Sequence, residues 1–417
     1  MLLATSILMA LMLLVAAAAA SDAQTGSTGN VKFPPRTTLV GVHYFAGWYP
    51  GPWSHWLYPT EPLLQRKSWV PDFPGRIPLG GNYTTNKSTV EADLIDADRY
   101  GVDFFEVLWS DPAVVGGGSS CDGGHDPADP NFHPCVDIGL VWMLNTTIWS
   151  ELNGGLRFFI SYSTDFDAPG TAAEGMFVGS DGESRWESYC ATWISAMSHP
   201  RYLKVDGRPL FKILGPEHFL GTQCSNNATL SQQRIDQFRA WAQAAGVGNP
   251  IIGGGWVTDD QPMPGRIYQG VEYDYTGVYG SAGRRPELGL CNSSVVYPYT
   301  QMDEWTNGRN WGNHSNDAVP WCPNVMASLD SRPALEKGCV FTFPTKSEWV
   351  ATLRRVKGIV EAPGSRLGFP STSAPGGVQP AITIYSWNEY QEGGIVAPTR
   401  GEQYMKLEGI KYVFQST

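Results

Sequence analysis

Strand-like and helix-like segments alternate along almost the whole chain, and this alternation limits the fold more than any other feature. Eight short apolar segments have the length of buried strands: Leu39–Phe45, Val102–Trp109, Leu156–Ser161, Pro209–Leu214, Pro250–Gly255, Val271–Val278, Asn324–Ser328 and Ala381–Trp387. A helical pattern or a long loop follows each of them. This order predicts an α/β fold, a (β/α)8 TIM barrel with long loops at the C-terminal face of the strands.

A doubly wound parallel sheet is the competing fold, because it also alternates strands and helices. It would place a glycine-rich phosphate-binding loop after the first strand, but the aromatic stretch AGWYPGPWSHW stands there instead. No change of composition marks a second domain. We therefore expect a single barrel domain over residues 37–417, after a signal peptide (residues 1–20) and a disordered segment (residues 21–36).

The N-terminal sequence is typical of an exported protein. Residues 1–20 are apolar and end in alanines, as in a secretory signal peptide, although the lack of Lys and Arg leaves an uncleaved anchor as the alternative. No other segment is long and apolar enough to span a bilayer, so we expect no stable membrane insertion after signal cleavage. Six N-x-Ser/Thr sequons indicate a secreted glycoprotein: Asn82, Asn86, Asn145, Asn227, Asn292 and Asn313.

The seven cysteines are spread over loop-like sequence, and an oxidising compartment would favour pairing. The preferred disulfide bonds are Cys121–Cys135 and Cys291–Cys322, although the sequence does not fix the connectivity. Cys190 lies on the apolar face of a predicted helix and is expected to be a buried free thiol. The loop between Cys121 and Cys135 holds His and Asp residues that could bind Zn²⁺ or Ca²⁺, but their spacing matches no metal motif, so no cofactor is expected.

Composition excludes some partners and suggests others. The net charge is −11 and no run of Lys or Arg occurs, so neither nucleic acid nor an anionic membrane surface is an expected partner. The chain has 16 Trp, 18 Tyr and 17 Phe, many of them beside Gly and Pro. Aromatic rings stack on the apolar faces of sugars, so an oligosaccharide or polysaccharide is the expected partner. The alternative is a core that is rich in aromatic residues.

The last strand-like segment, Ala381–Trp387, ends directly before two carboxylates, Glu389 and Glu392. In a barrel, the active site lies at the C-terminal ends of the strands. Glycoside hydrolysis uses two carboxyl groups, one of which protonates the leaving oxygen. A Glu-x-x-Glu pair on a solvated helix end is the structural alternative, but here the pair follows a buried strand and precedes two glycines. We therefore predict that these two glutamates are catalytic and shielded from solvent.

Polar and aromatic residues at the other strand ends are the candidate sugar ligands. His43 and Tyr44 must point to opposite faces of one strand, so one of them faces the helices. Asp330 also has a structural interpretation, as an ion pair with Arg332. The candidate substrate-binding set is His43, Tyr44, Trp48, Glu106, Trp109, Asp111, Tyr162, Trp256, Tyr275, Asp330, Trp387 and Asn388.

The stretch SWNEYQEGGIVAPT resembles the W-N-E-W-x-E-G signature of glycoside hydrolase family 99, the endo-α-mannosidase type, and of the related WbsX-like barrel proteins of polysaccharide loci. The early HYFAGWYPG also resembles the first strand and aromatic loop of that group. The resemblance implies that Glu389 is a base acting on the substrate 2-hydroxyl, with an epoxide-like intermediate, and that Glu392 is the general acid. The chain differs at Tyr390 and Gln391, where the family has Trp and the mannosidases usually have His, and this leaves the sugar open.

These observations together predict a secreted glycoside hydrolase, similar to endo-α-mannosidases, that cleaves an α-linked glycan or polysaccharide with a Glu/Glu acid–base pair and no cofactor. Two alternatives stay open: a non-catalytic carbohydrate-binding surface protein and a polysaccharide-assembly enzyme of the WbsX type. The sequence leaves the linkage, the cleavage mode, the stereochemical outcome and the oligomeric state undetermined.

Overall fold

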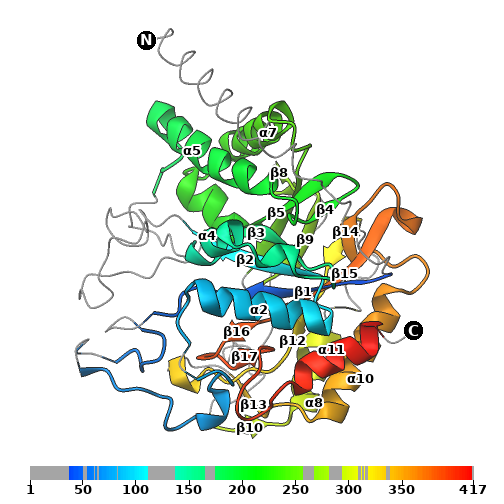
Figure 1. The fold of residues 1–417 in the computed structure, drawn as a ribbon. Coiled ribbons are helices and arrows are strands. Elements are labelled where there is room, and N and C mark those ends of the chain that lie inside the picture. Colours follow the sequence, from blue (N-terminus) through cyan, green and yellow to red (C-terminus); the bar gives the residue numbers. More distant parts are fainter. Residues whose placement is uncertain are drawn as a thin grey trace. The chain divides into compact units, whose positions relative to one another are not determined.

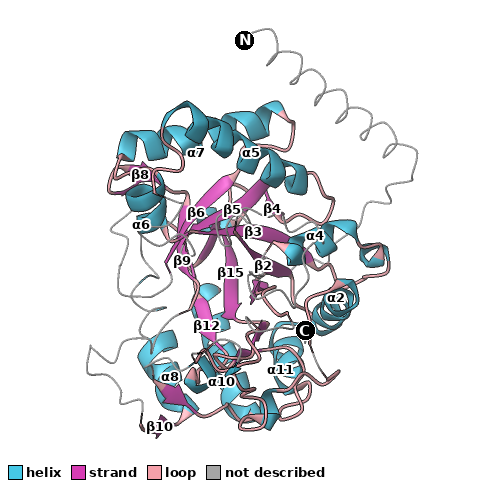
Figure 2. Cartoon of the chain, turned by 90° about the vertical axis from the view of Figure 1, so that its left-hand side faces the viewer, coloured by secondary structure: helices cyan, strands magenta, loops and turns pink. Residues whose placement is uncertain are grey.

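The computed structural model describes residues 37–49, 54–60, 62, 65–81, 83–110, 137–164, 174–256, 267–280, 294–308, 311, 314, 318–334 and 339–415. Residues 36–417 form one compact unit. Its centre is a parallel sheet surrounded by helices (Figures 1 and 2). The hydrogen-bonded order of its strands is β11 (Trp321–Cys322), β9 (Tyr275–Val278), β6 (Ile251–Trp256), β5 (Arg208–Leu214), β3 (Arg157–Ser163), β2 (Phe104–Trp109), β1 (Leu39–Tyr44), β15 (Val378–Tyr385) and β12 (Asn324–Met326).

The barrel closes through strands β11 and β12, which only Pro323 separates. β11 pairs with β9, and β12 pairs with β15 on the other side. Pro323 has no backbone N–H and cannot continue a ladder as donor, so the segment changes partner there. Because β15 also pairs in parallel with β1, the described strands form a nearly closed barrel in which β11 and β12 act as one strand. The predicted (β/α)8 barrel is confirmed.

Amphipathic helices cover the barrel. Helix α10 begins at a capping box made by Thr345 and Glu348 and buries Trp349, Leu353 and Val356 on one face. The longer helices are α2 (Lys87–Tyr100), α4 (Ile138–Asn145), α5 (Gly179–Met197), α7 (Ala228–Ala244), α10 (Lys346–Val360) and α11 (Met405–Gln415). The short elements between them are α6 (Pro216–His218), α8 (Tyr299–Met302) and three two-stranded sheets: β7 (Ile267–Tyr268) with β8 (Val271–Glu272), β10 (Val296–Tyr297) with β13 (Val340–Phe341), and β16 (Asn388–Glu389) with β17 (Gly394–Ile395).

Two element predictions need correction. The segment 271–278, predicted as one strand, is divided: β8 pairs back on β7, and β9 begins only at Tyr275. Asp274, between them, accepts hydrogen bonds from Arg239 and from the backbone of Ile252, which fixes a turn there. The apolar pattern of residues 141–152 also predicts a helix there, but α4 begins at Ile138 and ends at Asn145.

The cysteine predictions are confirmed in one case and wrong in another. Cys190 is a buried free thiol, as expected, and so are Cys224 and Cys322. The predicted Cys291–Cys322 bond is therefore wrong: Cys322 lies in strand β11 and is 4% exposed, within the barrel wall instead of in a loop. Cys339 is disulfide-bonded. The predicted Cys121–Cys135 pair lies outside the described residues.

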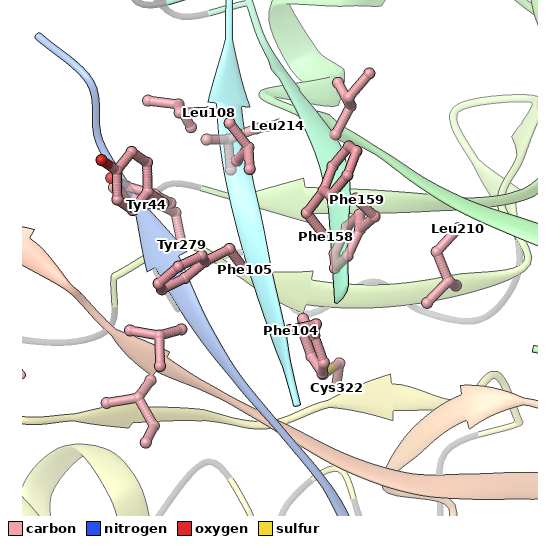
Figure 3. Packing of buried hydrophobic residues seen from close by; sticks show 14 of the residues in the cluster. Tyr44, Phe104, Phe105, Leu108, Phe158, Phe159, Leu210, Leu214, Tyr279 and Cys322 are labelled. Atoms are coloured by element: carbon pink, nitrogen blue, oxygen red, sulfur yellow. The ribbon is translucent and has the colours of Figure 1, made fainter. Parts of the chain in front are cut away.

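The barrel interior is filled in layers. Aromatic side chains occupy the layer near the start of the strands, where Phe104 and Phe159 lie with ring centroids 5.6 Å apart (Figure 3). Gly41 is required there, because a Cβ would lie 1.9 Å from the ring of Phe104. The next layer is polar and contains Lys212; a Cβ on Gly255 would lie 2.2 Å from its Cε. Glycines in the strands therefore make room for large inward side chains. Among the described residues, no helix has the length and hydropathy needed to cross a membrane.

Candidate active site

The two predicted catalytic glutamates lie on a tight turn after strand β15. The turn is closed by β16 and β17, in which Glu389 pairs with Gly394. Gly393 has a φ of +83°, and a Cβ there would lie 2.9 Å from the backbone N of Asp330. A Cβ on Gly394 would lie 2.3 Å from the ring of Tyr385. The two glycines after Glu392 are therefore needed to fold the turn against its neighbours.

Each glutamate accepts a hydrogen bond from a different tyrosine. Tyr279 Oη donates to Glu389 Oε1 at 2.8 Å, and Tyr385 Oη donates to Glu392 Oε2. The two tyrosine rings are nearly perpendicular, with centroids 5.3 Å apart. Glu389 is 8% exposed and Glu392 is partly buried. As predicted, neither is fully solvated, and both are held in defined orientations at the C-terminal end of β15.

Arg76 fastens this turn to the loop after β12. Its guanidinium donates to the carboxylate of Asp330 and to the backbone carbonyls of Asp330, Tyr390 and Gln391. Arg332 also donates to both oxygens of Asp330, at 2.7 and 2.8 Å. Burial would raise the pKa of Asp330, but the two arginines lower it. Asp330 was a candidate sugar ligand, with an ion pair to Arg332 as the alternative. The structure shows that ion pair.

A chain of buried polar groups crosses the barrel interior below the glutamates. Lys212 Nζ donates to Glu106 Oε1 at 2.8 Å, and His43 Nδ1 lies 3.2 Å from the same oxygen. Asn324 Nδ2 lies 2.9 Å from His43 Nε2. Burial would raise the pKa of Glu106, but His43 and Lys212 outweigh burial and lower it to about 2. Burial lowers the pKa of His43 despite the nearby Glu106. We therefore interpret Glu106 as ionised and His43 as neutral near pH 7.

The Trp387-Asn388 pair of the motif is anchored to strand β1. Asn388 Oδ1 accepts from Phe45 N at 3.0 Å, and Asn388 Nδ2 donates to Phe45 O at 2.6 Å. Trp387 is fully buried, and its ring lies 5.1 Å from Phe105 on the helix side of β2. Both residues were candidate sugar ligands. Their contacts make them supports of the turn, because they connect the end of β15 to the ends of its neighbours.

Asp93, on helix α2, is buried behind this anchor. It accepts hydrogen bonds from Tyr44 Oη and Tyr83 Oη. Burial raises the pKa of Asp93 to about 7, although the hydrogen bonds that it accepts from Tyr83 and Tyr44 act in the opposite direction. Asp93 is thus a titratable group that contacts residues supporting the turn of Glu389 and Glu392.

We expect Asp93→Asn to reduce the pH dependence of stability. The pKa is higher in the folded chain than the ordinary Asp value of 3.8, so this group stabilises the fold below about pH 4 and loses that contribution as the pH rises through 7. At 1.36 kcal/mol per pKa unit, the free energy of unfolding should fall by up to about 2–3 kcal/mol more between pH 5 and pH 8 in the parent than in Asp93→Asn. Urea unfolding at the two pH values measures this. Asp236→Asn, at an exposed carboxylate of α7, is the control, and an equal pH dependence in parent and Asp93→Asn would contradict the prediction.

Several aromatic candidates lie in the hydrophobic core instead of beside the glutamates. Trp109 and Tyr162 face helix α5, where their rings lie 5.3 and 5.1 Å from Trp193. Tyr44 faces helix α2, where its hydroxyl donates to Asp93. The alternation of the strand requires that one of His43 and Tyr44 face the helices, and it is Tyr44. The physical reason is the two-residue period of a strand: Glu106 points inward, so Trp109, three residues later, points outward. These residues support the alternative of an aromatic-rich core.

The remaining candidates lie at three different places. Tyr275 is at the first residue of β9, with its ring 5.2 Å from Phe369, deep in the barrel. Trp48 is fully buried beside His55, with ring centroids 5.6 Å apart, in the loop after β1. Asp111 and the side chain of Trp256 lie outside the part of the chain that the structure describes.

Four residues outside the candidate set shape the site: Tyr279, Tyr385, Asn324 and Arg76. Tyr279 directly follows β9 and Tyr385 is the last residue of β15, so the position of each at a strand end is the signal that selects it. Asn324 is a lone amide in the apolar run WCPNVMA, which is a recognisable signal for a buried polar contact. Arg76 gives no sequence signal, because its partners, the carboxylate of Asp330 and backbone carbonyls, lie more than 250 residues away in the chain.

Metal binding is not indicated in the described part of the chain, where no group of three or more His, Cys, Asp or Glu side chains gathers. The His- and Asp-bearing loop between Cys121 and Cys135 lies outside those residues.

Comparison with known proteins supports the fold. No protein-family model matches the chain, and no curated protein matches its sequence. Among solved structures, a glycoside hydrolase-like protein matches with a TM-score of 0.56 and 14% identity, over 94% of this chain and 98% of the other. The GH99 endo-α-mannosidase from Bacteroides thetaiotaomicron matches with a TM-score of 0.48 and 15% identity, over 90% and 97%. The exo-β-1,4-mannosidase Op5Man5 from Opitutaceae bacterium strain TAV5 gives 0.45 and 11%, over 90% and 58%. The match with a TM-score of 0.56 supports the (β/α)8-barrel fold described above.

Proposed function

We propose that this protein is a glycoside hydrolase that cleaves an α-linked glycan or polysaccharide, with Glu389 and Glu392 as its acid–base pair. The observation that carries the proposal is the pair of carboxylates at the C-terminal end of β15, each oriented by a tyrosine hydroxyl. In a barrel, that end of the strands is where catalytic residues gather. A protein that only binds sugar has no need of two such carboxylates.

The proposed reaction has two steps. In the first, Glu389 takes the proton of the sugar 2-hydroxyl while O2 attacks the anomeric carbon, the bond to the leaving oxygen breaks, and Glu392 protonates that oxygen. In the second, Glu392 takes a proton from water, the water oxygen opens the resulting 1,2-anhydro sugar at the anomeric carbon, and Glu389 returns its proton to O2. Two displacements at one carbon give net retention. The hydrogen bond from Tyr279 favours the ionised form that Glu389 needs as a base.

This chemistry restricts the substrate. Attack by O2 on the anomeric carbon requires the 2-hydroxyl to be trans to the leaving group, because the displacement is in line. An α-mannoside has this arrangement, whereas an α-glucoside has its 2-hydroxyl cis to the leaving group. We therefore propose an α-mannoside-type configuration in the sugar that is cleaved, in an endo-α-mannosidase-like activity.

We also propose that the protein is exported and glycosylated. The apolar residues 1–20 support a secretory signal. Three of the six sequon asparagines lie in the described part of the chain, and all three are exposed: Asn86, Asn145 and Asn227. Exposure is what attachment of a glycan requires.

The proposal is tested by incubating the purified protein with α-mannans, α-glucans and N-glycans, beside Glu389→Gln and Glu392→Gln. We expect sugar release from α-mannosides and not from α-glucans, and its loss in both variants while glycan binding persists. Glu408→Gln, at an exposed glutamate of helix α11, is the matched control and should retain turnover. Binding without turnover in the parent would favour a carbohydrate-binding protein, and transfer to a sugar acceptor in preference to water would favour an assembly enzyme.

A further inference from the structure

The buried polar chain Lys212–Glu106–His43–Asn324, here called the interior network, joins four strands of the barrel. Its members come from β5, β2, β1 and β12, and none is more than 2% exposed. Burying so many polar groups in a core is costly unless each is paired. The function proposed above does not use these residues directly, so their position below Glu389 needs another explanation.

The hydrogen bonds of Asn324 define the proton positions in this network. Asn324 Nδ2 lies 2.8 Å from the carbonyl oxygen of Tyr279. A carbonyl only accepts, so the atom facing it must be the amide NH₂ group, and the same group donates to His43 Nε2 at 2.9 Å. Nε2 is therefore the acceptor nitrogen of neutral His43, and Nδ1 carries the proton that faces Glu106.

The two ends of the interior network hold the end of strand β9. Lys212 Nζ lies 3.4 Å from the carbonyl oxygen of Val278, and Asn324 binds the carbonyl of Tyr279. The ring of His43 packs against the ring of Tyr279, with centroids 4.7 Å apart. Backbone and ring of Tyr279 are thus both fixed, and its hydroxyl is the group that donates to Glu389.

We propose that Asn324 and His43 are positioning residues that act on Glu389 through Tyr279. By fixing the carbonyl and the ring of Tyr279, they hold its hydroxyl in hydrogen-bonding contact with Glu389 and thereby keep that carboxylate ionised as a base. The catalytic meaning of this contact rests on the function proposed above. The contact itself does not.

The charged groups around the Tyr279–Glu389 hydrogen bond do not change when Asn324 is replaced, so we expect Asn324 to act on Glu389 through the position of Tyr279. Among the described residues, the titratable groups around this contact include Lys212, Glu106, His43, Tyr275 and Cys322, with Tyr385 and Glu392 at the end of β15. Glu106 is paired with Lys212, and His43 is held neutral by burial. Replacing Asn324 by another neutral residue changes none of these charges. A change in the titration of Glu389 in such a variant must then come through the placement of Tyr279.

The experiment measures the titration of Glu389 directly. Glutamate is labelled with ¹³C at the side-chain carboxyl, and the NMR signal of Glu389 is identified by its loss in Glu389→Gln. We expect Tyr279→Phe to raise the midpoint of this titration by about one pH unit, because a hydrogen bond to a charged group is lost. Asn324→Ser should raise it in the same direction by no more. The double variant should match Tyr279→Phe alone, because Asn324 acts through Tyr279.

Controls and a second readout complete the test. Asn153→Ser, at an exposed asparagine, should leave the midpoint unchanged. If Asn324→Ser does not fold, His43→Asn tests the same contact. With an active protein, the acid limb of the pH profile of kcat/KM should move with the NMR midpoint. An unchanged midpoint in Asn324→Ser or His43→Asn, or a shift that adds fully to that of Tyr279→Phe, would overturn the proposal. A parent without turnover would contradict the proposed function but leave the NMR result to decide this inference.

Discussion

Glu392→Gln is expected to reduce kcat/KM on an α-linked oligosaccharide by about 10²–10⁴-fold, the usual range for loss of a general acid. The loss should be far smaller on a 4-nitrophenyl glycoside, because nitrophenolate leaves without being protonated. Glu389→Gln should lower kcat/KM strongly on both substrates, because the base on the 2-hydroxyl is needed whatever the leaving group. Steady-state kinetics of both variants on both substrates measure the difference.

The control for this pair is Glu408→Gln, which should keep kcat/KM close to that of the parent on both substrates. If the nitrophenyl substrate rescues Glu389→Gln in place of Glu392→Gln, the two roles are reversed. If it rescues neither variant although both fold, Glu392 is not the general acid. Circular dichroism and the thermal midpoint show whether a loss of activity reflects misfolding.

Glu106→Gln is expected to lower the free energy of unfolding by about 3–5 kcal/mol, because it leaves the charge of Lys212 buried without its partner. Both side chains are almost fully buried, and their charged atoms lie 2.8 Å apart. Lys212→Met should be destabilising for the same reason. The double variant Glu106→Gln/Lys212→Met should lose less than the sum of the single variants, because no unpaired charge remains. Denaturant unfolding at pH 7 measures all three.

Lys346→Ala provides the matched control, because Lys346 and Glu408 form an exposed ion pair whose charged atoms lie 2.7 Å apart, close to the 2.8 Å of the buried pair. Exposed pairs contribute about 0–1 kcal/mol.

The pH dependence of stability gives a second check. The pKa of Glu106 is lowered to about 2, so its contribution is present above the ordinary Glu value and is lost as the pH falls toward 2. Additive single losses, or a loss no larger than that of Lys346→Ala, would contradict a coupled buried pair.

The part of the site that follows the last strand could be read from the sequence because its signals are local. An apolar strand, two carboxylates and two glycines are adjacent in the chain, and the structure places Glu389 and Glu392 at the end of β15 as that order requires. The period of the strand also required His43 and Tyr44 to face opposite sides. It did not say which one faces the interior, because that depends on the direction in which the sheet curves.

Contacts between residues far apart in the sequence could not be predicted in this way. Trp109 and Tyr162 lie at strand ends, where sugar ligands are expected. Their side chains point away from the barrel interior and pack on helix α5. Cys322 could pair in a loop but lies in the barrel wall. Arg76, Asp330 and the carbonyls of the turn that carries Glu389 and Glu392 meet only after the chain has folded.

The alternation of strands and helices can be read from the sequence, and it predicts the barrel and the strand that carries the two glutamates. The apolar N-terminal residues predict an export signal. These inferences depend on hydrophobic period and on neighbouring residues. Which inward side chains meet depends instead on the folded arrangement of the strands: Tyr279 meets Glu389, Tyr385 meets Glu392, and Asn324 meets His43. Closing eight strands brings residues from β1, β9, β12 and β15 together, and the register of each strand, set by its neighbours across the barrel, fixes which atoms come within hydrogen-bonding distance.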